Sequence, residues 1–302
     1  MILHPFDPWK SRLCTCPSKL SLNPYTGCAH GCLYCYASSY IPHFSRCRPK
    51  IDLLRRLARE AARVQPGTLV AMSNSSDPYP PLEEELELSR SCLKILRTRG
   101  LAVQVVTKSC LAARDADLLA GMSSCVAMTL TTLDDCISRN LEKGAPLPGQ
   151  RLKAMKRLAD SGVPVSARID PIIPGINDAE IDDLVTAVSG AGARHITSST
   201  YKARPGSLKK IINAFPEQGA ALQRLFAEGE TLGGSLYLSA EMRRDLMDKI
   251  KASAEKEGMT FSSCREGSAS APGISCDGSH LLPLPGIFKA GRIKEMLSLN
   301  SG

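Results

Sequence analysis

The sequence lacks the features of membrane and secreted proteins. No apolar run in its 302 residues reaches the roughly 18 residues that a membrane-spanning helix needs. The first residues show no basic segment followed by an apolar one, so no secretory signal is visible. We therefore expect a soluble, cytoplasmic protein without a membrane partner.

Aromatic side chains are also scarce, at 5% of the residues with a single tryptophan. This leaves limited scope for the stacking platforms that bind single-stranded nucleic acids. The net charge of +8 is still compatible with a nucleic-acid partner that is bound through its phosphates. Many soluble proteins carry such a charge without binding a polyanion, so the charge alone leaves both interpretations open.

Cysteine, by contrast, is abundant, with 12 residues. In a chain without a secretory signal, cysteines indicate metal ligation in a reducing compartment more than disulfides. Four of them lie in or beside apolar runs and are most simply small core residues: Cys92, Cys110, Cys125 and Cys136.

The middle of the chain alternates between two kinds of segment. Short apolar runs predict strands at residues 68–72, 101–107, 126–130, 163–169 and 195–199. Amphipathic stretches predict helices at residues 51–64, 86–97, 150–159 and 178–188. Asn177-Asp178 predicts a helix N-cap, and Gly100 and Gly162 predict helix ends. Alternating strands and helices predict a parallel sheet with crossover helices.

The alternation weakens after about residue 205. Residues 208–227 and 240–257 predict helices, residues 235–238 a short strand, and residues 262–285, rich in Gly, Ser and Pro, a loop.

Cys28, Cys32 and Cys35 have the spacing C-x-x-x-C-x-x-C. Iron–sulfur clusters are normally held by four thiolates. Three thiolates this close together can hold three irons of a cubane [4Fe–4S] cluster and leave the fourth iron open. A zinc site fits less well, because zinc prefers paired C-x-x-C ligands with a distant second pair.

This spacing resembles that of the radical S-adenosylmethionine (radical SAM) enzymes. In that family the open iron is chelated by S-adenosylmethionine, which an electron from the cluster cleaves to a 5′-deoxyadenosyl radical. The resemblance places the aromatic ring of Tyr36 beside the adenine and implies an electron donor of the flavodoxin or ferredoxin type. It also implies the α/β fold of these enzymes, a partial (β/α)6 TIM-like barrel with the cysteines in the first βα loop. Residues 1–205 would form this barrel with its cysteine-containing N-terminal segment, and residues 206–302 a helical and loop C-terminal extension.

Polar residues recur at the ends of the predicted strands, where α/β barrels have their active sites. A hydroxyl and amide cluster, which includes Ser73 and Ser75, follows the first strand and can bind an amino group. Lys108 follows the next strand and can pair with a carboxylate, and Thr129 ends the third, where it can meet a ribose. Arg168, with Asp170, ends the fourth. Each alone is better explained by a turn or a solvated surface; their recurrence at successive strand ends favours a site.

A series of short segments resembles, in sequence and in order along the chain, the branch of the superfamily that is related to spore photoproduct lyase, a DNA repair enzyme. They run over roughly residues 20–205 and are Tyr25-Thr26-Gly27-Cys28, Ser76-Asp77-Pro78, Thr107-Lys108-Ser109, Arg114-Asp115, Leu141-Glu142 leading to Arg151, and Pro171-Ile172-Ile173-Pro174-Gly175. The resemblance implies that Lys108 and the hydroxyls near Ser75 and Thr129 contact S-adenosylmethionine. The lyase places a hydrogen-donating cysteine just before its Ser-Asp pair, whereas Asn74-Ser75-Ser76-Asp77 has none. Lesion reversal by that thiol is therefore not expected.

Four further cysteines, Cys14, Cys16, Cys264 and Cys276, lie in polar segments near the two chain ends. Together they are chemically sufficient for an auxiliary cluster or a zinc ion, and free or redox-active thiols are the alternative. The run Cys276-Asp277-Gly278-Ser279-His280 also looks like the core of the CDGSH iron–sulfur proteins, but the rest of that motif is missing.

The sequence thus predicts a radical SAM enzyme acting on a macromolecule, with a nucleic acid as the first choice and a peptide or small molecule as the next. Arg46-Cys47-Arg48-Pro49-Lys50 and Lys202-Ala203-Arg204 are the candidate phosphate contacts. Two other classes stay open: a non-catalytic iron–sulfur protein that transfers electrons, and a zinc-stabilised nucleic-acid-binding module.

Overall fold

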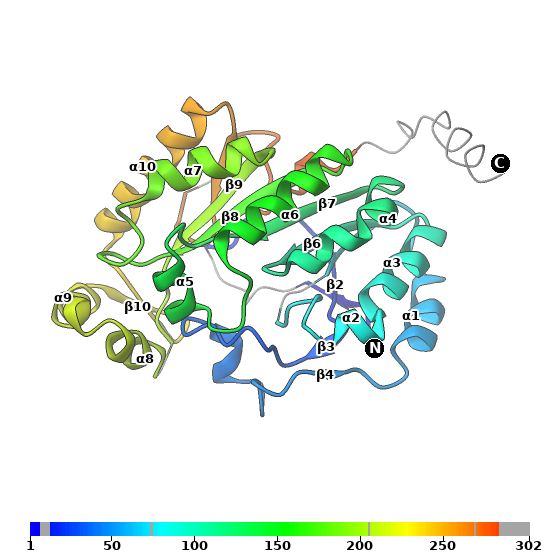
Figure 1. Cartoon of the computed structure of the whole chain (residues 1–302), viewed down its shortest axis with the longest axis horizontal. Helices are drawn as coiled ribbons and strands as arrows, with labels where there is room; N and C mark the ends of the chain where they lie inside the picture. Colours follow the sequence, from blue (N-terminus) through cyan, green and yellow to red (C-terminus); the bar gives the residue numbers. More distant parts are fainter. Residues whose placement is uncertain (7–12, 73–74, 205, 269, 284–302) are drawn as a thin grey trace.

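The computed structural model describes residues 1–6, 13–72, 75–204, 206–268 and 270–283 (Figure 1). Among these residues the main sheet has eight strands in the order β1-β2-β5-β6-β7-β8-β9-β12. All neighbours from β2 to β12 are parallel, and β1 pairs antiparallel with β2 at one edge. The strands are β1 (His4–Pro5), β2 (Leu20–Leu22), β5 (Leu69–Met72), β6 (Ala102–Thr107), β7 (Ser124–Thr129), β8 (Val165–Ile172), β9 (Ala193–Thr200) and β12 (Thr260–Ser263).

Helices follow most of these strands and pack on the outside of the curved sheet (Figure 1). They are α1 (Leu53–Ala61), α2 (Glu83–Leu86), α3 (Leu88–Thr98), α4 (Ala116–Ala120), α5 (Asp135–Leu141), α6 (Pro148–Asp160), α7 (Ile181–Gly190), α8 (Ser207–Ala214), α9 (Pro216–Ala227) and α10 (Ala240–Lys256), with the short 3₁₀ helices η1 (Tyr36–Ser39), η2 (Cys110–Asp115) and η3 (Ser279–Leu281). Two small ladders, β3 (Tyr25–Thr26) with β4 (Arg48–Pro49) and β10 (Glu230–Leu232) with β11 (Ser235–Tyr237), lie outside the main sheet. None of the described helices is long and apolar enough to cross a membrane.

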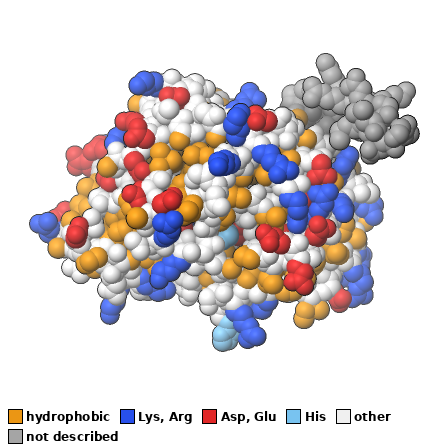
Figure 2. All heavy atoms as spheres, in the orientation of Figure 1, with side chains coloured by type: hydrophobic (Ala, Val, Ile, Leu, Met, Phe, Trp, Pro, Cys, Tyr) orange, Lys and Arg blue, Asp and Glu red, His pale blue; other side chains and the backbone are white. Residues whose placement is uncertain are grey.

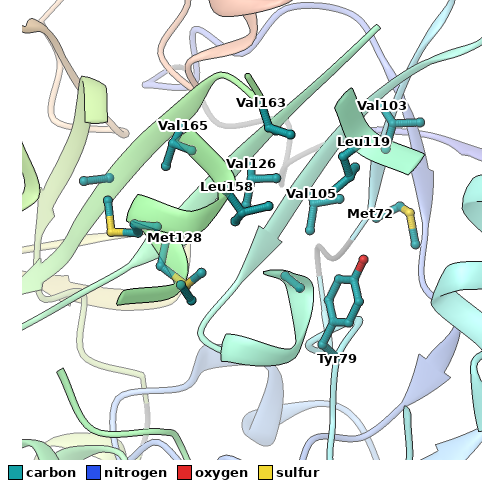
Figure 3. Close-up of a cluster of buried hydrophobic side chains, with 14 of the residues drawn as sticks. Met72, Tyr79, Val103, Val105, Leu119, Val126, Met128, Leu158, Val163 and Val165 are labelled. Atoms are coloured by element: carbon teal, nitrogen blue, oxygen red, sulfur yellow. The ribbon is translucent and has the colours of Figure 1, made fainter. Parts of the chain in front are cut away.

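The core lies between the sheet and these helices. Val105, Val126 and Val165 are partners in register on β6, β7 and β8, and all three are fully buried. Figure 3 shows this row facing Leu119 and Leu158 from the helical layer. Burying one such side chain stabilises the fold by about 1.5–3 kcal/mol, so this apolar row fixes the positions of the strand ends.

The predicted α/β partial barrel is confirmed, and each of the five predicted strands and four predicted helices has a counterpart within a few residues. The helix ends at Gly100 and Gly162 are confirmed as well, with φ values of +64° and +81°. The triplet lies between β2 and α1, in the first βα connection.

Some local predictions were wrong. Asn177-Asp178 does not cap α7, whose N-cap is Glu180, because both side chains bond to the turn before it. Asn177 accepts from the Ile173 amide at 2.7 Å, and Asp178 accepts from Gly175 at 2.8 Å. The predicted helix 208–227 is two helices, because Pro216 starts α9.

The C-terminal part of the chain completes the main sheet. β12, of which Ser262 and Ser263 fall in the predicted loop, pairs parallel with β9. The boundary near residue 205 remains a prediction, and the sheet extends across it.

Candidate active site

The three cysteines of the triplet lie in one loop that the short β3–β4 ladder holds at its base. The Cys28 amide donates to the Phe44 carbonyl at 2.8 Å, and the Cys35 amide donates to Cys32 at 3.2 Å. Gly27 precedes the first cysteine with φ +78°, and a Cβ there would lie 2.5 Å from the Phe44 oxygen. Only glycine therefore permits this start of the loop.

The three thiols are half-buried and line one cavity of about 600 Å³. Burial raises the pKa of Cys28 to about 11 and that of Cys32 to about 12. Thiolate ligands must lose these protons, and a bound metal supplies the compensating charge. Three soft ligands in one loop beside a cavity of ligand size fit an iron–sulfur cluster with an open iron.

No three His, Cys, Asp or Glu side chains within the described ranges converge closely enough to hold one metal ion. This does not argue against a cluster, because a cubane spreads its thiolates over different irons, whereas a single ion needs every sulfur about 2.3 Å from one point.

A buried carboxylate fixes one side of the cysteine loop. Glu142 accepts hydrogen bonds from Tyr34 and, at 3.1 Å, from Thr131, and its other oxygen lies 2.5 Å from the Arg151 guanidinium. Lys108 Nζ lies 4.0 Å from the same carboxylate. Although burial raises the pKa of Glu142, Lys108 and Arg151 bring it below its usual value. Glu142 is therefore ionised and holds the loop next to α5.

A second buried carboxylate, Asp77, joins the loop to two strand ends. His30 Nε2 lies 3.0 Å from Asp77, and the Lys108 amide and the Thr107 hydroxyl donate to it at 2.8 and 2.7 Å. Burial raises the pKa of Asp77, but His30 and these donors outweigh it and lower the pKa to about 2. The Ser-Asp-Pro segment thus positions the cysteine loop over β5 and β6.

The structure brings five of the six predicted cofactor-binding residues to the wall of the same cavity: Tyr36, Ser75, Lys108, Thr129 and Arg168. The sixth, Ser73, lies outside the described residues. The Lys108 ammonium lies 5.4 Å from the Tyr34 ring centre, and Arg168 pairs with Asp170 at 2.6 Å. Direct contact of these residues with S-adenosylmethionine stays a prediction.

The far wall of the cavity contains buried ion pairs that the sequence did not predict. Lys19 and Asp277 form an ion pair there in which both side chains are buried. Deeper in this wall, buried Glu266 pairs with Lys202 at 2.7 Å and with Arg243 at 3.4 Å. Glu266 follows β12 by three residues, so its position after a strand could have pointed to the site. No feature of the sequence around Asp277 pointed to its place in the cavity wall.

One prediction about charge needs correction. Lys202 was a candidate phosphate contact, but its side chain is 7% exposed and paired with Glu266. Arg46, in the other basic run, is exposed, and Lys50 is half-buried with a pKa lowered by burial. On the face shown in Figure 2, basic and acidic side chains are interspersed.

Comparisons with known proteins agree with this geometry. The family model described as the radical SAM superfamily matches residues 22–188. An uncharacterized protein of Methanocaldococcus jannaschii is 30% identical over 166 residues, which are 54% of this chain and 64% of that protein. The match thus covers less than two thirds of that relative's length.

Two further proteins have named activities. The Radical SAM Nalpha-GlyT isomerase of Pseudomonas phage M6 is 22% identical over 279 residues, covering 88% of this chain and 58% of that protein. Spore photoproduct lyase complexed with dinucleoside spore photoproduct superposes with a TM-score of 0.63 at 16% identity, covering 86% of this chain and 78% of that one. At this identity the likeness shows a common fold.

Proposed function

The chain belongs to the radical SAM superfamily of enzymes, and we propose that Cys28, Cys32 and Cys35 hold a [4Fe–4S] cluster that binds and cleaves S-adenosylmethionine for a reaction on a nucleic acid. When bound, the cluster supplies the electron that cleaves the sulfonium to a 5′-deoxyadenosyl radical. The observation that carries this proposal is that the three cysteines and the strand-end polar residues line one cavity. A reductant must deliver the electron, and a flavodoxin- or ferredoxin-like protein is our choice.

The residues of the chain hold the cofactor and shield the reaction. Lys108 is buried among anionic groups yet has a further face on the cavity, where its charge attracts the carboxylate of S-adenosylmethionine. Tyr36 lines the cavity one residue after the last cysteine and offers its ring to the adenine. Ser75, which follows β5, and Thr129, at the end of β7, add hydroxyls to the cavity wall. The surrounding walls keep water from the reacting atoms.

Anaerobic turnover tests the enzymatic part of the proposal. The protein is reconstituted with iron and sulfide, reduced, and incubated with S-adenosylmethionine. We expect 5′-deoxyadenosine, detected by chromatography, from the native chain and none from the Cys28→Ala variant. Unchanged S-adenosylmethionine in the native reaction, at full iron loading, would contradict the proposal.

Three facts support a nucleic-acid substrate. The chain carries a net charge of +8. The structure with the common fold contains a dinucleoside, and the exposed Arg46 lies two residues beyond the cavity-lining Phe44. Neutralising phosphates releases counterions, so the affinity should fall steeply with salt.

Binding assays with single-stranded DNA, double-stranded DNA and RNA over a salt series test the substrate class. We expect binding at low salt to at least one of the three, weakened in an Arg46→Ala variant with a reduced salt slope. Absence of binding to all three would move a peptide or small-molecule substrate to first place, while formation of 5′-deoxyadenosine would still stand.

A further inference from the structure

Four cysteines that the proposed reaction does not use come together at the cavity's far wall. Cys14 and Cys16 precede β2, Cys264 directly follows β12, and Cys276 lies just before η3. Cys14, Cys16 and Cys264 line the cavity, and Cys276 is buried behind them. Residues from opposite ends of the chain thus form one group, which we call the terminal cysteines.

The two central sulfurs are close but not bonded. Cys16 Sγ and Cys276 Sγ lie 3.3 Å apart, whereas a disulfide has about 2.05 Å. Two thiolates on one tetrahedral zinc, each about 2.3 Å from it, are separated by about 3.8 Å. Cys14 and Cys264 both lie within electrostatic range of Cys16. The spacing of the central pair is therefore near that of two ligands of one metal.

Cations lie beside three of these cysteines. Arg265 lies within electrostatic range of Cys14, Lys19 of Cys16, and Arg168 of Cys264. Lys19 and Arg168 are themselves paired with Asp277 and Asp170. A bound metal must therefore supply most of the charge that stabilises the thiolates, as at the triplet.

The segment that carries Cys276 is fixed before any metal binds. The Thr197 hydroxyl donates to the Cys276 carbonyl at 2.9 Å, and the Gln104 amide donates to the Asp277 carbonyl at 2.6 Å. Asp277 also pairs with buried Lys19. A Cβ on Gly278 would lie 3.0 Å from the Ser166 hydroxyl, so the turn packs tightly against the inner face of β8. One ligand is therefore held rigidly by four strands or strand ends.

We propose that Cys14, Cys16, Cys264 and Cys276 bind a second metal centre, a zinc ion or a small iron–sulfur cluster, through four thiolates. Soft thiolate sets select these two kinds of centre. A disulfide between Cys16 and Cys276 would leave Cys14 and Cys264 without a role. The described side chains do not yet converge on one point, and the same is true of Cys28, Cys32 and Cys35, where the family implies a cluster. A small cluster does not need its ligands to converge on one point, whereas a zinc ion would have to draw Cys14 and Cys264 inward when it binds.

Metal content tests this second centre independently of the proposed function. A variant in which Cys28, Cys32 and Cys35 are all alanine removes the first site. After anaerobic purification and reconstitution, we expect this triple variant to keep about one metal centre per chain, measured as zinc or as iron with sulfide. Adding Cys16→Ser and Cys276→Ser should lower the metal to background. Adding Cys136→Ser instead, on the exposed face of α5, should leave it unchanged.

A second measurement covers the case in which the Cys16/Cys276 variant does not fold. Cobalt(II) is added to the folded triple variant, and thiolate-to-metal absorption and protection of Cys14, Cys16 and Cys264 from alkylation are read. We expect the absorption to appear and these three cysteines to become protected. A triple variant that binds no metal and leaves the three cysteines reactive overturns the proposal, as does a Cys16–Cys276 disulfide found by mass spectrometry in its place.

Discussion

The cavity has two sides that use similar electrostatics in different ways. On what we call the cysteine side, Glu142 pairs with Arg151 at 2.5 Å and with Lys108 at 4.0 Å. On the terminal side, which includes the terminal cysteines, Glu266 pairs with Lys202 at 2.7 Å and with Arg243 at 3.4 Å. Each side thus holds one buried glutamate between two cations.

The two sides differ in what their glutamates hold. Glu142 contacts Tyr34 in the cysteine loop, while Glu266 accepts from the Thr200 amide at the end of β9. The family model covers residues 22–188, which include the cysteine side and exclude Glu266. This contrast teaches that the region matched by the superfamily model forms the cysteine side, whereas Glu266 on the terminal side lies outside the matched residues.

The largest effect should come from removing a cysteine-side ligand. Cys28→Ala, Cys32→Ala or Cys35→Ala each deletes a thiolate that no neighbour replaces, so cluster absorption near about 400 nm and cleavage of S-adenosylmethionine should both be lost. Cys136→Ala, an exposed control, should behave as the native chain. A single triplet variant with full iron content and activity would refute the assignment of the cluster.

Next come the two glutamates, which test the comparison directly. Glu142→Gln removes the charge shared by Lys108 and Arg151. Glu266→Gln removes the charge shared by Lys202 and Arg243, although Arg243 keeps Glu230. Each change should lower the free energy of unfolding by about 3–5 kcal/mol. Urea denaturation of the metal-free protein measures this. Only Glu142→Gln should also reduce the iron retained at the triplet, because only Glu142 holds the cysteine loop. Equal iron loss in both variants would remove the distinction between the two sides.

A smaller effect is expected at Lys108. A charge-assisted contact to a carboxylate contributes roughly 1.5–3 kcal/mol, so Lys108→Ala should weaken S-adenosylmethionine binding by about ten- to a hundredfold. Lys202→Ala, the matched change on the terminal side, should leave that affinity unchanged, since its ammonium is taken up by Glu266. Calorimetry on the reconstituted proteins distinguishes the two; similar losses would mean that the cofactor spans both walls.

The smallest effect is expected at an exposed ion pair, which serves as the reference for the buried pairs. Lys156 and Asp160 form an exposed i, i+4 pair on α6 at 3.0 Å. Lys156→Ala should cost only about 0.2–0.5 kcal/mol in urea denaturation, since solvent screens such a pair. If Lys156→Ala lowered the free energy of unfolding as much as the glutamate variants do, burial would not explain why the glutamate pairs matter more than this exposed pair.

Local patterns in the sequence predicted much of the fold. The apolar runs that correspond to β5 to β9 form strands of four to eight residues and are flanked by amphipathic helices, so the sequence pattern indicated these strands. β2 has only three residues, and β12, with the sequence Thr260-Phe261-Ser262-Ser263, is mostly polar, so neither forms an apolar run. The Asn177-Asp178 cap failed because a nearby turn competes for the same side chains.

On the terminal side of the candidate site, the sequence pointed to the four cysteines but not to the ion pairs around them. The cysteine spacing and the strand ends placed the triplet, Lys108 and Thr129 on the cavity. The Lys202–Glu266 and Lys19–Asp277 pairs join residues that are distant in sequence, and local sequence patterns do not show which cation will pair with which carboxylate. That is why Lys202 looked like a surface cation.

The pairing of Lys19 with Asp277 also has a consequence for how the chain is made. The two residues are 258 positions apart. Ribosomes add about 5–20 residues per second, so roughly 13–50 seconds separate the synthesis of one partner from that of the other. During that interval β2 through β9 can already pair in order, while the interior still opens to the solvent where the Cys276–His280 turn will lie. The Cys276–His280 turn therefore closes the cavity only after β2 to β9 have been synthesised.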